Sequence, residues 1–393
     1  MLKTTMRLIG EFTGIVFVET EQPWNQKVLE NSLLFKIKFD KPDYGTRKKI
    51  FDYVLKKNSL RFDKKNVDLL ASKFSLTHSQ IYNAVLSAMN SAKTRYAGNT
   101  ITNEDLNNGC KSVSNQNLTK LAKKIKPNYT WDEIILPPST LTALRDICGR
   151  VKNREIVYHD WGFDKKFSLG KGVVALFKGE SGTGKTMAAE VIANDLELDL
   201  YKIDLSTIVS KYIGETEKNI NKIFTEAETS NAILFFDEAD ALFGKRSETK
   251  DAHDRYANIE TNYLLQKIEE YEGVVILATN FQKNIDQAFM RRMHFVIDFP
   301  FPDSKYRLLI WKNAFPEKTP INQDVDFKFL SEHIRLSGGN IKNVAINAAF
   351  LAAQGSHKIT MRDIIVSVKQ EYQKIGRPMA KGEFGKYASL ADQ

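Results

Sequence analysis

Hydrophobic residues in the last two thirds of the chain follow two different spacings. Short apolar runs bounded by glycines or polar residues predict buried strands, and longer stretches with apolar residues every three or four positions predict helices. The predicted strands are Val173–Phe177, Leu200–Leu205, Ala232–Asp237, Gly273–Asn280 and Phe295–Phe299, and the predicted helices are Lys185–Leu196, Thr216–Thr229 and Tyr256–Tyr271. This alternation predicts an α/β domain with a mainly parallel sheet and helices on both faces. From about Ser304 the spacing is helical only, which predicts a small helical subdomain.

The first third of the chain repeats the back half of this pattern. Eleven residues between Phe35 and Asn83 recur 260 positions later, and among them Arg47 recurs as Arg307. Near residue 100 the offset falls to 258, where Thr102 matches Thr360. The patterns therefore predict four segments. They are a partial, degenerate module with late strands and a helical part (1–130), an α/β domain (131–303), a helical subdomain (304–376) and a flexible tail (377–393).

A glycine-rich segment joins the first predicted strand to the first predicted helix. It reads Gly179-Glu180-Ser181-Gly182-Thr183-Gly184-Lys185-Thr186 and fits the P-loop pattern G-x-x-x-x-G-K-[ST]. Its backbone N–H groups and the start of the helix suit phosphate groups. Lys185 is then expected to reach the β- and γ-phosphates of ATP, and the Thr186 hydroxyl to bind Mg²⁺. The strand–loop–helix context disfavours the alternative, a glycine-rich turn without a ligand.

Polar residues at the ends of later strands complete a candidate catalytic site. Asp237 and Glu238 close an apolar strand, where an Asp of P-loop enzymes helps to hold Mg²⁺ and Glu238 can activate the attacking water. Asn280 closes the next strand and can hydrogen-bond that water or the γ-phosphate. Arg291 and Arg292 are candidates for an arginine finger. The alternatives are a helix-capping acidic pair, a turn Asn and ordinary surface charge.

Charge and composition limit the remaining classes of function. The chain has 393 residues and a formal net charge of +9; residues 1–130 carry 22 Lys/Arg against 11 Asp/Glu, so the remainder is slightly acidic. The excess of positive charge in the first third of the chain weakly favours a function in nucleic-acid binding. No apolar run approaches the roughly 20 residues of a membrane span, and Glu11 interrupts any signal peptide. With Cys110 and Cys148 alone, a disulfide scaffold is excluded and a cytoplasmic location with reduced thiols is expected.

Taken together, the motifs in residues 131–376 resemble those of the AAA (AAA+) ATPases. Lys211-Tyr212-Ile213-Gly214 resembles the family's first pore loop, in which an aromatic residue grips an extended polypeptide. The segment Leu336–Ile341 resembles the lid segment that closes over the adenine. The resemblance implies a P-loop NTPase sheet with a helical lid, ATP and Mg²⁺ as cofactors, and self-association into a ring of six subunits. One protomer would bind ATP, and its neighbour would supply Arg291 or Arg292; because Arg291-Arg292-Met293 replaces the family's Arg-Pro-Gly-Arg, either Arg can be the finger, and Arg291 is preferred with Arg292 kept.

Three further short segments resemble a subgroup of this family. The segments Asp160–Phe163, Gly244–Ser247 and His253–Asn258 are similar to bacterial two-module AAA ATPases. Members of that group occur with phage-tail-like contractile injection systems. In the partial copy, Glu21 stands where the second copy has Asn280, and the given chain begins too late to include a first P-loop. We therefore expect a truncated chain, or a start at an internal Met.

Three functions are compatible with these patterns. The leading one is an ATP-hydrolysing motor that remodels, unfolds or disassembles a protein substrate as a ring, with the polypeptide passing Tyr212. A nucleic-acid loader or translocase is the alternative, made unlikely by the slightly acidic catalytic module. A non-hydrolysing scaffold is disfavoured by the intact Lys185, Thr186, Asp237 and Glu238.

Overall fold

The structure is a computed structural model. It describes residues 12, 14–17, 37, 39, 41–60, 62–94, 101–114, 122–166, 170–205, 215–230, 232–240, 252–280, 287–355, 357–378 and 382–391. The chain divides into two units, Met1–Lys41 and Pro42–Gln393, and all of the described helices and strands belong to the second. None of the helices within these ranges combines the length and apolar character needed to cross a membrane.

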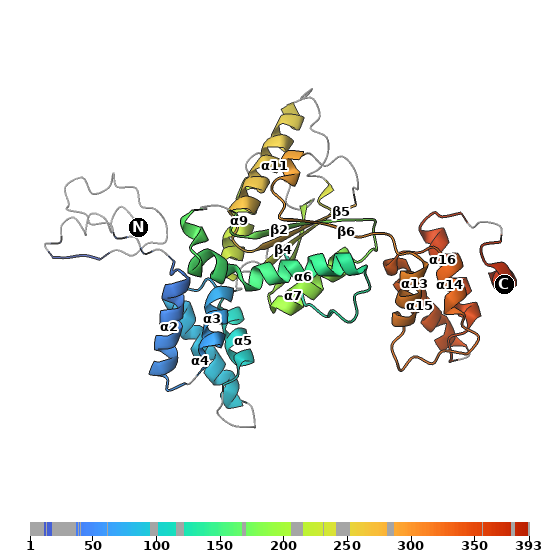
Figure 1. The fold of residues 1–393 in the computed structure, drawn as a ribbon, viewed down its shortest axis with the longest axis horizontal. Coiled ribbons are helices and arrows are strands. Elements are labelled where there is room, and N and C mark those ends of the chain that lie inside the picture. The colour runs from blue at the N-terminus through green and yellow to red at the C-terminus, as the bar shows by residue number, and fades with distance from the viewer. Residues whose placement is uncertain are drawn as a thin grey trace. The chain divides into compact units, whose positions relative to one another are not determined.

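A six-stranded sheet forms the centre of the α/β domain (Figure 1). Its strands are β1 (Lys123–Ile125), β2 (Val173–Lys178), β3 (Leu200–Asp204), β4 (Ile233–Asp237), β5 (Val274–Thr279) and β6 (Phe295–Asp298). Their order is β1-β3-β4-β5-β2-β6; β1 runs antiparallel to β3, and all other neighbours are parallel. The predicted α/β class with a mainly parallel sheet is confirmed. Because β1 belongs to this sheet, the α/β domain begins before the predicted boundary at residue 131.

Alternate residues of the strands pack against helices on opposite faces of the sheet. On one face Ala175 and Phe177 pack against α6 (Pro138–Lys152) and α7 (Lys185–Leu196). On the other face Val174 and Leu176 pack with residues of α9 (Glu215–Ser230) and α11 (Ala252–Glu270). Burial on both faces explains why these strands read as continuous apolar runs rather than alternating ones. The sheet is thus held between two helical layers, which fixes the positions of the loops at its carboxyl edge.

Four helices form a separate core after the sheet, called here the second bundle. They are α13 (Ser304–Asn313), α14 (Phe327–His333), α15 (Gly338–Gln354) and α16 (Met361–Lys374). The short helix α12 (Gln287–Met290) precedes β6. The segment after Gly376 was expected to be loose, but part of it forms η5 (Gly385–Tyr387) and α17 (Ala388–Ala391) and packs against this bundle through the buried Phe384. That expectation is therefore wrong for residues 382–391.

The helical part of the first third forms an equivalent first bundle. It comprises α2 (Tyr44–Lys57), α3 (Lys64–Lys73), α4 (His78–Thr94) and α5 (Asn103–Ser114) around its own apolar core. Arg47 is buried, and its Nε donates to Ala71 O over 2.8 Å; the buried Arg307 donates in the same way to Ser331 O over 2.9 Å. Because both arginines reach 24 residues along the chain, the internal repeat predicted from the sequence is confirmed for these bundles.

Other hydrogen bonds of the two bundles also occur at equivalent positions. The Nη1 atoms of the two arginines donate to Pro42 O and Pro302 O, each over 2.7 Å. At the starts of α5 and α16, Thr102 and Thr360 each exchange hydrogen bonds with an Asp three residues later. The late strands predicted for residues 1–41 lie mostly outside the described residues, so they stay a prediction.

Polar contacts join the first bundle to the α/β domain. Lys73 at the end of α3 pairs with Glu197, the residue that follows α7, with Nζ and Oε2 2.6 Å apart. Arg154 Nη2 donates to Ser72 O over 3.4 Å. Two short elements follow Arg154, η3 (Ile156–Asp160) and η4 (Phe163–Lys165). The contact at Glu197 places the first bundle at the end of α7 opposite to the P-loop, from which α7 begins.

Candidate functional site

The glycine-rich loop between β2 and α7 adopts a backbone that requires its glycines. Gly182 and Gly184 have φ angles of 78° and 103°, in the left-handed region that side chains disfavour. A Cβ atom on Gly179 would lie 2.4 Å from the carbonyl oxygen of Phe299. The loop can therefore wind tightly between a strand and a helix start, which leaves backbone N–H groups available for an anion.

Lys185, the first residue of α7, is buried in the mouth of this loop. Its Nζ donates to Gly179 O (2.7 Å), Glu180 O (2.9 Å) and Asn280 Oδ1 (3.0 Å). Burial lowers the pKa of Lys185, and the nearby Asp237 and Asp240 oppose this by favouring the ammonium form. The predicted P-loop lysine and the predicted strand-end asparagine thus lie in hydrogen-bond contact.

Asp237 and Glu238 follow the apolar residues of β4 and lie on the same side of the sheet as the loop. Glu238 has a φ of 52°, an uncommon value for a residue with a side chain, and its side chain is exposed. Its backbone N–H donates to Asp237 Oδ1 over 3.1 Å. Asp237 Oδ2 is 2.5 Å from the Nζ of Lys202, a residue of β3 that sequence reasoning did not identify. The strained turn directs Glu238 away from the sheet, while Lys202 fixes the carboxylate of Asp237.

Asp240 is a further residue that sequence reasoning missed. Its Oδ1 accepts hydrogen bonds from the Thr279 hydroxyl and, over 3.0 Å, from the backbone N–H of Asn280. It therefore ties the end of β4 to the end of β5 and holds Asn280 in place. The signal available in the sequence was a third carboxylate shortly after the Asp-Glu pair.

One cavity of about 830 Å³, within the size range of small-molecule sites, is lined by the P-loop residues 181–186, Asp237, Glu238 and Asn280. The second bundle contributes Gly339, whose N–H donates to Gly182 O over 2.9 Å, and Lys342, whose Nζ donates to Tyr129 Oη over 2.9 Å. Apolar side chains close another side, and the sequence did not identify them: Ile134, Ile135, Leu136, Ile310 and Ala314. The cavity thus joins a polar anion cradle to an apolar slot, as a nucleotide with a flat base requires.

The donors near the loop also suit a hard divalent cation. The Thr186 hydroxyl and the Asp237 carboxylate both line the cavity, and Mg²⁺ prefers oxygen ligands. Within the described ranges there is no cluster of three His, Cys, Asp or Glu residues that could hold a metal by itself. Mg²⁺ usually shares one or two protein oxygens with substrate phosphates and water, so Thr186 and Asp237 could hold it together with a bound nucleotide.

The two candidate arginine fingers have different surroundings. Arg292 pairs with Glu269 of α11, with Nε and Oε1 2.5 Å apart, whereas Arg291 is exposed. Neither residue lines the cavity of its own chain. The predicted pore-loop residues Lys211, Tyr212 and Ile213 lie outside the described residues.

The fold and the site define a P-loop nucleotide-binding domain. Residues 175–301 match the model of the ATPase family associated with various cellular activities (AAA), so this part of the chain is an AAA-family domain. The family to which these motifs were compared is thereby confirmed for the catalytic segment.

Curated relatives match a longer part of the chain. A proteasome-activating nucleotidase of Saccharolobus solfataricus is 30% identical over 255 residues, covering 62% of this chain and 63% of the relative. A katanin p60 ATPase-containing protein of Danio rerio is 30% identical, covering 67% and 57%. A 26S proteasome regulatory subunit 6B homolog of Encephalitozoon cuniculi is 31% identical, covering 51% and 53%. The chain thus spans between 53% and 63% of the lengths of these relatives.

Proposed function

We propose that this protein hydrolyses Mg-ATP and uses the energy to remodel, unfold or disassemble a protein substrate. One observation carries the proposal: the P-loop, Lys185, the Asp237-Glu238 pair, Asn280 and the lid residue Gly339 surround a single cavity of about 830 Å³. The AAA family assignment of residues 175–301 supports ATP as the nucleotide. The second bundle then acts as the nucleotide lid.

The polar residues at and behind the cavity have defined tasks in this proposal. The P-loop N–H groups and Lys185 hold the β- and γ-phosphates, while Thr186 and Asp237 hold Mg²⁺, which neutralises part of the phosphate charge when bound. Glu238 orients a water molecule and accepts its proton as the water oxygen bonds to the γ-phosphorus. The bond from that phosphorus to the bridging oxygen breaks, and ADP keeps the electron pair. Asn280 positions the water by hydrogen bonding, and Asp240 holds Asn280.

We also propose a ring, with six subunits as in the family resemblance. The exposed Arg291 supports this arrangement, because an exposed guanidinium is free to reach the γ-phosphate of a neighbouring protomer. Arg292 is the weaker candidate because Glu269 already neutralises it. Tyr212, flanked by Lys211 and Ile213, is proposed to grip the polypeptide, in keeping with relatives named for proteasome activation.

The source of substrates and the cellular location are inferred from sequence resemblance and from the cysteines. The similarity to two-module AAA ATPases of contractile injection systems suggests one source of protein substrates. A cytoplasmic location agrees with two cysteines that are both free and buried. The second candidate, a nucleic-acid loader or translocase, is favoured by the excess of eleven positive charges in residues 1–130. Salt-dependent binding of DNA would support that alternative.

The Glu238→Gln variant tests the proposed chemistry. It keeps the size and hydrogen-bonding of the side chain but cannot accept the water's proton, so turnover should fall at least about 100-fold while ATP affinity stays unchanged. The readouts are phosphate release at several protein concentrations and binding of a fluorescent ATP analogue.

Glu332→Gln is the matched control, because Glu332 is exposed on α14 and does not line the cavity, so its turnover should stay unchanged. Undiminished turnover in Glu238→Gln would contradict the proposed role of Glu238. Turnover per protomer that is independent of protein concentration down to the dissociated state would contradict the need for a neighbour's arginine.

A further inference from the structure

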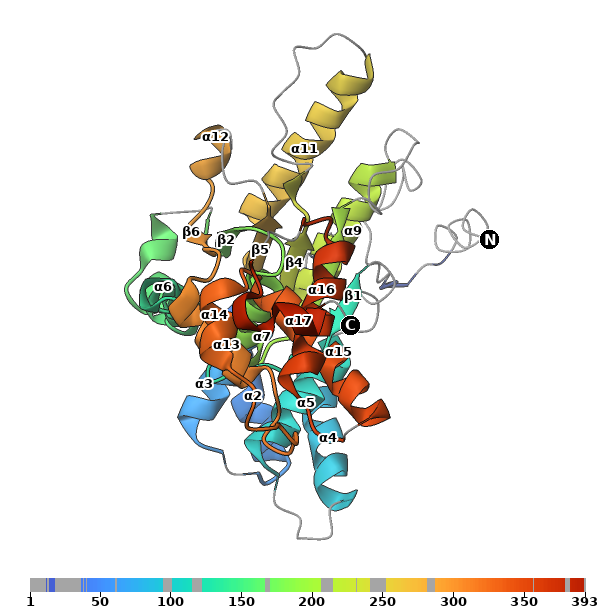
Figure 2. The same cartoon turned by 90° about the vertical axis from the view of Figure 1, so that its right-hand side faces the viewer.

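The second bundle holds a segment of its own chain in the groove between α14 and α16. Phe384 is buried there, and the Tyr387 ring meets the Phe329 ring edge-on at 4.9 Å. Lys386 pairs with Asp326 over 2.9 Å. Figure 2 shows α17 beside α16, with which it makes direct contacts. This groove is therefore built to take a short peptide segment through an aromatic anchor and one ion pair.

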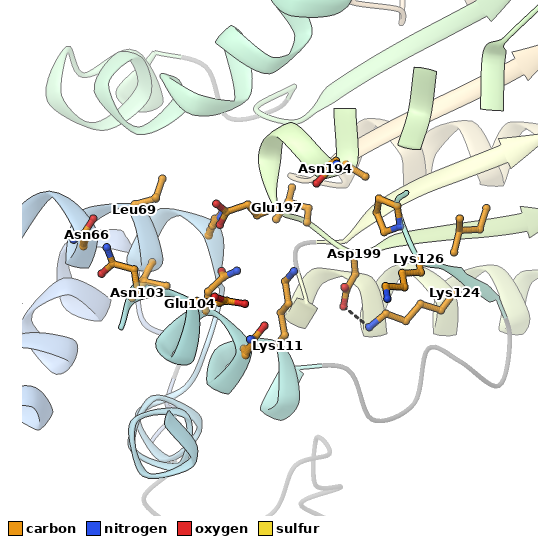
Figure 3. Close-up of a pocket in the computed structure, with 18 residues that line it drawn as sticks. Asn66, Leu69, Asn103, Glu104, Lys111, Lys124, Lys126, Asn194, Glu197 and Asp199 are labelled. Carbon is orange, nitrogen blue, oxygen red and sulfur yellow. Dashed lines mark hydrogen bonds and ion pairs between the residues drawn. The ribbon is translucent and has the colours of Figure 1, made fainter. Parts of the chain in front are cut away.

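The equivalent groove of the first bundle lies between α3 and α5, and no segment among the described residues fills it. It forms part of a cavity of about 1170 Å³ between the first bundle and the end of α7 (Figure 3). Leu69 occupies the position that corresponds to Phe329 in the repeat, and Leu69 is 45% exposed whereas Phe329 is 8% exposed. The apolar anchor point is thus present in both bundles but covered in only one.

The lining of the first groove is polar where the second groove is apolar. Asn103 and Asn107 stand in α5 at the positions that Met361 and Ile365 hold in α16. Asn107 is only 9% exposed, and its Oδ1 has no hydrogen-bond partner within the described structure. Because this oxygen is itself buried, a ligand in the cavity meets the exposed side-chain amides of Asn103 and Asn108 instead. Side-chain amides both donate and accept hydrogen bonds, as a peptide backbone requires.

The charges of the first groove favour an acidic ligand. Lys73 and Lys124 are neutralised by Glu197 and Asp199. Lys111 and Lys126 also line the cavity (Figure 3), and they form no ion pair with any described residue. Glu104 is the one further carboxylate of the lining, so the lining keeps one net positive charge. Asp326, which pairs with Lys386 in the second bundle, is replaced by Asn66 at the equivalent position of the first bundle. The first groove has therefore lost its site for a lysine and offers two unpaired ammonium groups instead.

We propose that the groove between α3 and α5 binds an acidic peptide segment of a partner protein. An apolar or aromatic side chain of the peptide covers Leu69, its backbone hydrogen-bonds to the exposed amides of Asn103 and Asn108, and its carboxylates meet Lys111 and Lys126. This recognition is independent of the proposed ATPase chemistry, because the groove lies at the opposite end of α7 from the P-loop.

Two synthetic peptides test the proposal with the full chain. Both have the sequence of residues 382–391, and one carries the change Lys386→Glu. At low salt the Lys386→Glu peptide should bind about tenfold more tightly than the unmodified one, since charge pairs at a groove are weakly screened there. Fluorescence anisotropy of the labelled peptides gives both affinities.

Protein variants locate the binding. The double change Lys111→Glu with Lys126→Glu, and separately Leu69→Asp, should each weaken binding of the acidic peptide about tenfold or more. Lys369→Glu is the matched control, because Lys369 is the counterpart of Lys111 in α16, and it should leave the affinity unchanged. Circular dichroism confirms that each variant is folded.

Three outcomes would overturn the proposal. The first is a lack of binding of the acidic peptide at low salt, and the second is equal binding of the two peptides. The third is binding that neither the lysine variants nor Leu69→Asp alters. Displacement of the peptide by a single-stranded oligonucleotide of equal affinity would reassign the groove to nucleic acid.

Discussion

The two helical bundles share a scaffold but stand at opposite ends of α7. In each, a buried arginine bridges to a carbonyl 24 residues later, and a Thr–Asp pair opens the last helix. The second bundle lies against the P-loop, where α7 begins. The first bundle lies against Glu197, directly after α7 ends. The repeated sequence therefore specifies how each bundle folds, and separate residues specify where it docks.

The two bundles differ at two residues in the contact with the P-loop that the proposed lid uses. In the second, Gly338 and Gly339 lie against the P-loop, and a Cβ atom on Gly339 would lie 3.0 Å from the Cα of Gly182. The first bundle has His78 and Ser79 at these positions, and both are exposed. Side chains of this size cannot make the same close approach to a backbone. The comparison teaches that two bundles with the same core contacts can differ in the residues that allow close approach to the P-loop.

The largest effect is expected when the two equivalent arginines, Arg47 and Arg307, are replaced, because these changes distinguish a loss of stability from a loss of ATP binding. Arg47→Ala and Arg307→Ala each leave buried carbonyl oxygens without a donor, so each should lower the free energy of unfolding by about 3 kcal/mol. Only Arg307→Ala should also weaken binding of ATP, because only its bundle borders the nucleotide cavity. Thermal unfolding and titration with a fluorescent ATP analogue measure the two effects.

The lysine variants Arg47→Lys and Arg307→Lys serve as controls, since they keep the charge but lose the forked geometry. An equal loss of ATP affinity in Arg47→Ala and Arg307→Ala would contradict the claim that only the second bundle takes part in nucleotide binding. An unchanged unfolding temperature in both alanine variants would show that the matching contacts do not hold the bundles together.

A smaller effect is expected at the contact with the P-loop. Gly339→Val places a branched side chain against Gly182, and the lid must move away to accommodate it. Overpacking of this kind costs about 1–3 kcal/mol, so ATP affinity should fall about tenfold. The matched variant Ser79→Val changes the exposed counterpart in the first bundle and should leave ATP affinity unchanged. Equal affinities of the two variants for ATP would contradict the assigned role of the second bundle.

The sequence predicted those features that local pattern determines. The helix Lys185–Leu196 has the predicted bounds, and Lys185 and Asn280, which are 95 residues apart, both lie at the loop. Parallel strands bring their carboxyl ends to one edge of a sheet, so motifs placed at strand ends converge. The repeat similarly predicted the first bundle, because Arg47 and Arg307 serve the same contact.

Features that depend on tertiary contact could not be predicted. The strand β1 has only three residues, two of them lysines, and its pairing with β3 gives it its structure. Nothing in the local sequence distinguishes Lys202, because only the pairing of β3 with β4 brings it to Asp237. The apolar slot formed by Ile134, Leu136 and Ile310 combines segments that no local pattern connects. The packing of Phe384 likewise requires the folded second bundle.

Amide hydrogen exchange with and without Mg-ATP tests the central contrast most directly, with the Glu238→Gln variant used to keep the nucleotide intact. Nucleotide should slow exchange in the P-loop and in residues 336–342, where Gly339 meets Gly182. Exchange in the matching residues 76–82 of the first bundle should remain unchanged. Protection of residues 76–82 with no protection of residues 336–342 would contradict the assignment of the second bundle as the lid.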